Sequence, residues 1–163
     1  MRWNLFVPLA VLCTVLGLLG NYYWHVSAST RYLANVKEQA DADISMVGDT
    51  LLISISAGQA LSEFLPRLEG DKLGKLLARN KIDLCRKDSL PVDGGLKNQV
   101  DLVVAQALAT EEFYNAERIL RQLAEEHGMT AELTIWQGLL VAEVRDAGHS
   151  YIAHGRLKEG IRP

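Results

Sequence analysis

The feature that most constrains this chain is an uncharged stretch near its N-terminus. Between Arg2 and Arg31 there is no Lys, Arg, Asp or Glu over 28 residues. Its apolar centre, LFVPLAVLCTVLGLLG at 5–20, holds ten Leu, Val or Phe residues, each of which favours membrane insertion by about 0.3–0.6 kcal/mol. A helix from Trp3 to Trp24 would rise about 31 Å, close to the ~30 Å hydrocarbon thickness of a bilayer. The stretch predicts a transmembrane anchor over residues 1–26.

Aromatic residues flank this predicted anchor. Trp3 stands at one end and Tyr22, Tyr23 and Trp24 at the other, a pattern typical of the membrane interface. A cleaved signal peptide is the alternative, with the small residues VSA at 26–28 as its cleavage site. Because the N-terminal tail is only two residues long, we expect it to stay in the cytoplasm. This predicts a single-pass protein of the inner (cytoplasmic) membrane with a periplasmic or extracytoplasmic C-terminal region.

The next segment, 27–66, shows helical periodicity. Apolar residues from Leu33 to Leu65 recur with a mean step of 3.56 residues, which predicts a long stalk or bundle helix that ends at Pro66. The alternating patch LLISIS at 51–56 leaves a β-strand open as the alternative. Small residues in and after that patch would allow a tight helix crossing or a dimer contact: Ser54, Ser56, Ala57, Gly58 and Ala60.

A basic connector, 67–95, follows. It is expected to hold a short helix, Lys72–Arg79, and a loop at 86–95 (RKDSLPVDGG) that is rich in turn-forming residues. Lys72, Lys75 and Arg79 share one face of the short helix. That face either packs on the acidic helices around it or binds an anionic partner such as lipid headgroups.

The remaining segments also show helical spacing. A helix from Leu96 to His127, ended by Gly128, and another from Thr130 to Ala147, ended by Gly148, would form a helical hairpin over 96–148. Residues 149–163 form a tail. The predicted fold class is therefore all-α: an N-terminal transmembrane helix that continues into, or is followed by, a small helical bundle.

Composition and motifs exclude several functions. A net charge of −3 argues against a nucleic-acid partner, which needs a basic face. Short motifs for hydrolases, metalloproteases, redox dithiols and phosphate loops are missing. His127 falls at a helix end. His149 and His154 are five residues apart, about 140° out of alignment on a regular helix, so binding one metal together would need a loop. The sequence predicts no catalytic, cofactor-binding or metal site and no enzymatic activity.

Cys85 is the residue with the most open chemistry. Cys13 lies in the predicted anchor, so an exported domain would carry Cys85 unpaired. Ile82 and Leu84 beside it favour burial, whereas Arg86 and Lys87 favour exposure. The two readings are a buried thiol or an intermolecular disulfide that links a homodimer.

These observations predict a membrane-anchored helical protein that serves as a structural or interaction component of a cell-envelope assembly, with protein partners. One alternative is a sensory or regulatory ectodomain that signals through a partner. The other is a lysis protein, because a short N-terminus, one span, a long helix and a mid-chain cysteine resemble in outline the phage inner-membrane spanins. The chain lacks the dense charged coiled-coil pattern of that family.

Overall fold

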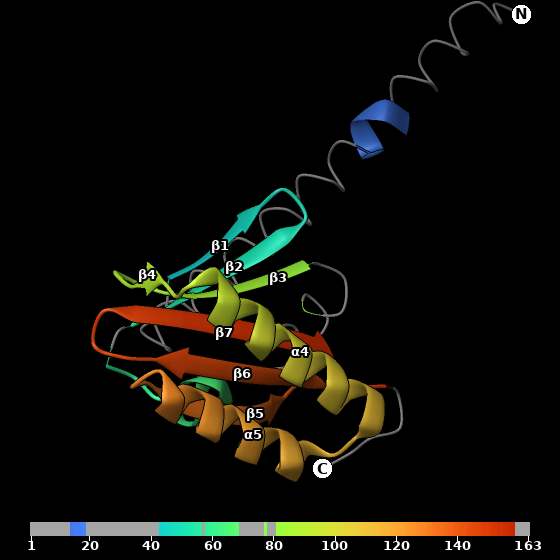
Figure 1. Ribbon diagram of the computed structural model, residues 1–163. Coiled ribbons are helices and arrows are strands. Elements are labelled where there is room, and N and C mark those ends of the chain that lie inside the picture. The colour runs from blue at the N-terminus through green and yellow to red at the C-terminus, as the bar shows by residue number, and fades with distance from the viewer. Residues whose placement is uncertain (1–13, 19–42, 57, 69–76, 78–80, 159–163) are drawn as a thin grey trace, which may run out of the picture.

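The computed structural model describes residues 14–18, 43–56, 58–68, 77 and 81–158. These residues form a mixed α/β fold in which two sheets pack together and two helices cover the outside (Figure 1). In chain order the elements are β1 (Asp43–Val47), β2 (Thr50–Ile55), α2 (Leu61–Phe64), η1 (Leu65–Leu68), β3 (Lys81–Arg86), β4 (Leu90–Pro91), α4 (Gly94–Thr110), α5 (Phe113–Glu126), β5 (Thr130–Trp136), β6 (Leu139–Arg145) and β7 (His149–Arg156).

The small sheet has the strand order β1-β2-β3. β1 and β2 form an antiparallel hairpin that turns at Gly48, whose φ of 64° suits glycine. β2 and β3 run parallel, with Thr50 opposite Lys81. Along β2 every second residue is fully buried, namely Leu51, Ile53 and Ile55. The alternation in LLISIS is therefore the signature of a strand with one buried face.

The large sheet has the strand order β4-β7-β6-β5. β5, β6 and β7 form an antiparallel meander, and the short β4 pairs in parallel with the start of β7. Gln137 and Gly138 connect β5 to β6 with φ values of 50° and 75°, the positive values that a tight two-residue hairpin requires. β6 lies in the interior of this sheet, and most of its residues are buried.

Two hydrophobic clusters hold the layers together, one on each face of the large sheet. On one face α4 and α5 pack against β6 through Val100, Leu120, Leu140 and Val144 (Figure 1). On the other face the small sheet, α2 and η1 pack against residues of β5, β6 and β7. This second cluster includes Leu51, Ile53, Phe64, Leu84, Trp136, Val141 and Ile152.

The predicted all-α class is wrong. Strands β1 and β2 stand where one long helix was expected over 27–66, and β5, β6 and β7 replace the helix at 130–147 and part of the tail. The spacing of Leu133, Trp136, Leu140 and Val144 suits a helix only by coincidence. β6 is buried on both faces and so shows an apolar run, interrupted only by Glu143, instead of alternation; this run hid the period of two.

The predicted membrane anchor is also corrected. Of that stretch the structure describes the short helical segment 14–18, in which Val15, Leu16 and Leu18 are exposed. Among the described residues no helix has the length and apolarity needed to cross a bilayer. This finding overturns the single-pass topology and the inner-membrane location inferred from hydropathy alone. Trp3, Tyr22, Tyr23 and Trp24 lie outside the described residues.

The helical hairpin that was expected over 96–148 is built differently. The predicted helix from Leu96 to His127 is two helices, because Glu111 adopts a left-handed φ of 63° and ends α4. Asp93 precedes α4 as its N-cap, and its side chain accepts a 2.8 Å hydrogen bond from the Gly95 amide. After α5, Gly128 has a φ of 69°, which confirms the predicted glycine stop.

Candidate functional site

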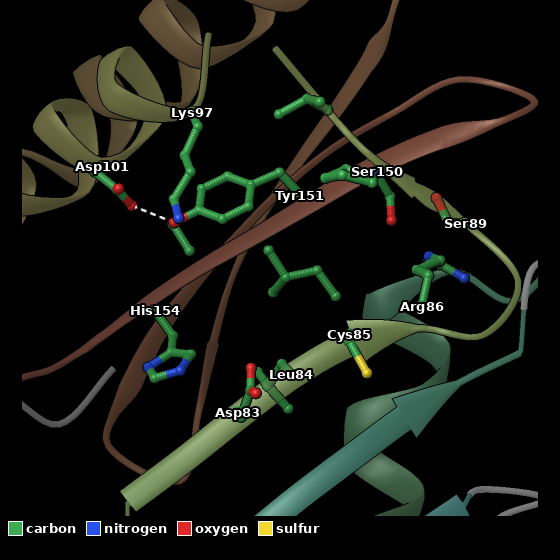
Figure 2. Close-up of a pocket in the computed structure, with 14 residues that line it drawn as sticks. Asp83, Leu84, Cys85, Arg86, Ser89, Lys97, Asp101, Ser150, Tyr151 and His154 are labelled. Atoms are coloured by element: carbon green, nitrogen blue, oxygen red, sulfur yellow. Dashed lines mark hydrogen bonds between the residues drawn. The ribbon is translucent and has the colours of Figure 1, made fainter. Parts of the chain in front are cut away.

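A cleft of about 540 Å³ opens between β3, the start of α4 and β7 (Figure 2). Its volume falls within the range of pockets that hold ligands, about 300–1,000 Å³. Residues 83–86 of β3 line one side and residues 150–154 of β7 line the other. Lys97 and Asp101 reach into it from α4. Segments from three parts of the chain thus meet around one hollow.

Strand edges bound this cleft on two sides. β3 is the last strand of the small sheet, and among the described strands none pairs with its outer side. Lys81 and Lys87 donate their amides to Asp49 and Ile55 on the β2 side. Because alternate residues of a parallel strand bond to the same neighbour, the backbone groups of Leu84 point away from β2. Leu84 lines the cleft, so its peptide groups face the open side.

The edge of β7 behaves in the same way. β4 covers its outer side only at His149 and Ser150. The His149 carbonyl accepts from Asp146 and the Leu157 amide donates to Gly138, which assigns the odd-numbered residues to the pairing with β6. The backbone groups of Ile152 and His154 therefore face away from β6, and both residues line the cleft.

Tyr151, Asp101 and Lys97 form the polar wall of the cleft on the α4 side. The Tyr151 hydroxyl donates a 2.6 Å hydrogen bond to the Asp101 carboxylate, and the Lys97 ammonium lies 5.3 Å from the centroid of the Tyr151 ring (Figure 2), within cation–π range. Burial, the hydrogen bond to Asp101 and the charges of Asp101 and Asp83 raise the pKa of Tyr151. Tyr151 is therefore a neutral donor and not a base.

Asp83 lies on the opposite wall, on β3. It is exposed, and no ion pair or hydrogen bond joins its carboxylate to any other described residue. Arg86 also lines the cleft, but its charge is balanced by the buried Glu143. The unbalanced charges on the lining are thus the Asp83 and Asp101 carboxylates against the Lys97 ammonium. The cleft carries a net negative charge.

Cys85 is part of the lining, but its thiol is directed toward β2 (Figure 2). Its sulfur lies 3.1 Å from the Ser54 hydroxyl of β2, the residue directly opposite in the small sheet, and Figure 2 shows the Sγ directed toward β2. The side chain is half-buried. Within the described part of the cleft, no thiol or hydroxyl is hydrogen-bonded to a histidine nitrogen. The intermolecular disulfide stays a prediction.

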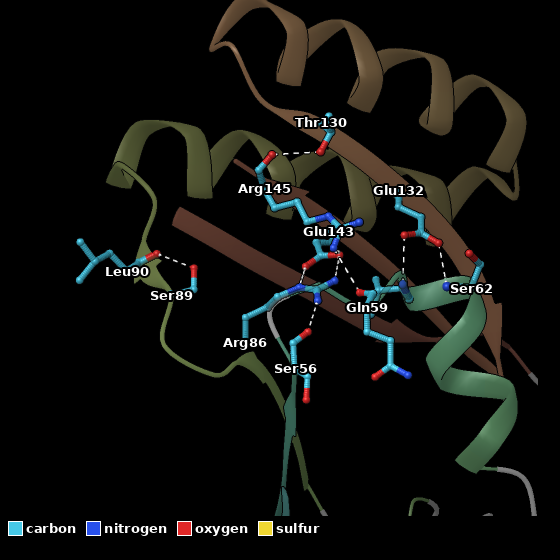
Figure 3. Close-up of polar contacts among 11 residues, drawn as sticks. Ser56, Gln59, Ser62, Arg86, Ser89, Leu90, Thr130, Glu132, Glu143 and Arg145 are labelled. Carbon is cyan, nitrogen blue, oxygen red and sulfur yellow. Dashed lines mark hydrogen bonds and ion pairs between the residues drawn. The ribbon is translucent and has the colours of Figure 1, made fainter. Parts of the chain in front are cut away.

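Directly behind the cleft, a buried ion pair joins the two sheets; we call the pair Arg86–Glu143 the clamp (Figure 3). Both guanidinium nitrogens that face Glu143 donate to its carboxylate, one of them at 2.8 Å, and a third nitrogen donates to the Ser56 carbonyl at 2.7 Å. The two side chains are 2% and 0% exposed. In this bidentate geometry, the attraction and the hydrogen bonds of a buried pair can offset the free energy that desolvating its two charges costs.

A second carboxylate, Glu132, lies opposite Glu143 on β5. It accepts 3.1 Å and 2.7 Å hydrogen bonds from the Leu61 and Ser62 amides at the start of α2 (Figure 3). Burial raises its pKa, but the hydrogen bonds from Ser62 and Leu61 and the charge of Arg145 outweigh this effect and lower it. Arg145 also lies 3.8 Å from Glu143 and donates to the Gln59 carbonyl. Glu132 and Glu143 thus face each other with like charges, and each carboxylate has hydrogen-bond donors of its own.

The other residues singled out in the sequence are scattered. Lys72, Lys75 and Arg79 lie outside the described residues. His127 lies at the end of α5, where its ring contacts the Leu123 carbonyl at 2.9 Å. His149 and His154 both belong to β7, and their odd separation puts them on opposite faces of the sheet. In the described part of the chain, no three metal-ligating side chains gather into a site.

Sequence reasoning missed Asp83, Lys97, Asp101 and Tyr151, because a cleft between two sheets cannot follow from an all-α prediction. The usable signal in the sequence was the alternation TAELTIW at 130–136, which is typical of a half-buried strand and argues for a sheet in this half of the chain. Comparisons with protein-family models, curated proteins and solved structures gave no match for this chain. The function is therefore argued from the geometry of the cleft.

Proposed function

We propose that this chain is a protein-interaction module that binds an extended polypeptide segment in the cleft. The segment pairs with the outer edge of β3, beside Leu84, and lies against β7. This keeps the interaction role expected from the sequence. It gives up the membrane-anchored helical form, which the fold contradicts.

The observation that carries the proposal is a cleft bounded by two strand edges. Peptide groups at an open edge serve as a template for another strand, and recognition by strand addition takes its affinity from such main-chain hydrogen bonds. The lining residues 83–86 and 150–154 each form an extended run. Four residues of extended chain span about 13 Å, which suits recognition of a short linear segment.

The lining side chains support binding over catalysis. Burial and the hydrogen bond to Asp101 keep Tyr151 protonated, and among the described residues Cys85 is hydrogen-bonded to Ser54 and to no base. A nucleophilic mechanism needs a nucleophile within hydrogen-bonding reach of a base. We infer a non-enzymatic role for this site.

The test starts from a library of random twelve-residue peptides displayed on phage and selected on the purified chain. The tightest peptide is then resynthesised with one backbone amide methylated at a time. Strand addition predicts that methylation weakens binding about tenfold or more at alternate positions, because each methyl removes one interstrand hydrogen bond and blocks the edge. The positions between them should tolerate it.

Amide chemical-shift changes on peptide addition supply the location. We expect the largest changes at Leu84, Ile152 and His154. Selected peptides that shift only residues of α5, or that bind equally well with every amide methylated, would contradict the proposal.

A further inference from the structure

The residues on the two faces of β3 determine which side chains a bound polypeptide segment needs. The two sides of β3 differ: Leu84 points into the hydrophobic cluster between the sheets, whereas Asp83 and Cys85 lie on the opposite face, where Cys85 meets Ser54. In a sheet, residues directly opposite each other on neighbouring strands share a face. A strand added to β3 would therefore meet an apolar residue and a carboxylate at adjacent positions.

Resting on the proposed function, we infer that the bound segment alternates apolar and basic residues and places a Lys or Arg opposite Asp83. The apolar side chain next to it lies on the face of Leu84 and Ile152, which are 4% and 7% exposed and both line the cleft. The basic side chain pairs with a carboxylate that has no partner among the described residues. The cleft thus fits a cationic extended segment.

Two further observations agree with this charge. Of the cations on the lining, Arg86 is held in the clamp and Lys97 lies over the Tyr151 ring beside Asp101. Neither is directed at Asp83. In addition, after burial, the hydrogen bond to Asp101 and the charges of Asp101 and Asp83 raise the pKa of Tyr151, because both carboxylates lie near its hydroxyl.

The test compares three capped eight-residue peptides in which valine alternates with lysine, glutamine or glutamate. Binding is measured by fluorescence anisotropy at low salt, and amide shifts report the location. We expect the lysine peptide to bind about tenfold tighter than the glutamate peptide, with the glutamine peptide between them. The difference should shrink at high salt, because exposed charges are screened.

Matched variants of the chain separate a local contact from overall charge attraction. Asp83→Asn should weaken binding of the lysine peptide about fivefold, in line with the loss of an exposed ion pair. Asp83→Lys should reverse the preference, so that the glutamate peptide binds more tightly than the lysine peptide. Asp88→Asn is the control, because Asp88 is exposed in the turn after β3 and does not line the cleft. It changes the net charge equally and should leave affinity unchanged. Thermal unfolding confirms that each variant is folded.

Each result decides the matter. If all three peptides shift Leu84 and Ile152 with equal affinity, or if Asp83→Asn and Asp88→Asn have the same effect, the basic preference is wrong and the polypeptide site stands. If no peptide, whether from this set or from the library, shifts the cleft residues, the proposed function fails together with the inference.

Discussion

Two charged regions lie on the same strand, and they differ in whether their charges are satisfied. At the end of β3, the Arg86 side chain is 2% exposed, and it donates hydrogen bonds to the Glu143 carboxylate and to the Ser56 carbonyl. Three residues earlier, Asp83 is exposed at the cleft without a partner among the described residues. The comparison separates charges that hold the fold together from charges that are available to a ligand. Substitutions at the first site should affect stability, and those at the second should affect binding.

The largest expected effect comes from breaking the clamp. Glu143→Ala leaves the Arg86 guanidinium buried without its main partner, which typically costs about 3–5 kcal/mol. We expect the free energy of unfolding, measured in urea, to fall by about that amount. A loss below about 1 kcal/mol would show that the pair is not buried between the sheets.

The double variant Arg86→Met, Glu143→Leu sharpens the same point. Replacing both partners by apolar side chains of similar size removes the uncompensated charge, so most of the stability lost in Glu143→Ala should return. The measurement is again urea unfolding, in parallel with peptide binding. Because Arg86 lines the cleft, peptide affinity is recorded separately and does not enter this stability comparison.

A smaller effect on the free energy of unfolding is expected at Glu132, which accepts hydrogen bonds from the amides at the start of α2. Glu132→Gln should cost about 0.5–1 kcal/mol at neutral pH, because most of its surface is still solvated. The pKa of Glu132 is lowered in the folded state from 4.5, so its contribution is present above that value and is lost as the pH falls through the folded pKa. Unfolding curves of both chains should therefore converge as the pH falls well below 4.5. Curves that stay separated at low pH would contradict this origin.

A similarly small effect on stability is expected within the cleft. Tyr151→Phe removes the hydrogen bond to Asp101 but keeps the ring under Lys97, and should cost about 0.5–1 kcal/mol in thermal or urea unfolding. Tyr151 belongs to the cleft, whose residues are expected to affect binding more than stability. A fall in the free energy of unfolding as large as that of Glu143→Ala would mean that the cleft residues also hold the fold together.

Local signals in the sequence predicted the structure correctly where a single residue determines the backbone conformation. Gly128 ends α5 as expected, and much of the 96–127 stretch is helical. The break at Glu111 was missed because glutamate rarely adopts a positive φ. The alternation at 51–56 was noticed, but the helical spacing on both sides of it was given more weight.

The cleft could not be predicted for a different reason. Asp83, Lys97 and Tyr151 come from β3, α4 and β7, and the packing of both β3 and α4 against β7 brings them together. The clamp has the same origin, because Arg86 and Glu143 are 57 residues apart. Neither pairing leaves a local spacing pattern in the sequence.

The most direct test of the central claim is hydrogen exchange at single amides of β3 with and without a saturating cleft-binding peptide. The Leu84 amide faces the open edge, whereas the Asp83 and Cys85 amides face β2. Strand addition predicts that exchange slows at Leu84 by about tenfold or more, since a new hydrogen bond protects it, while Asp83 and Cys85 change little. Equal protection along β3, or none at Leu84 when the peptide is bound, would contradict the account.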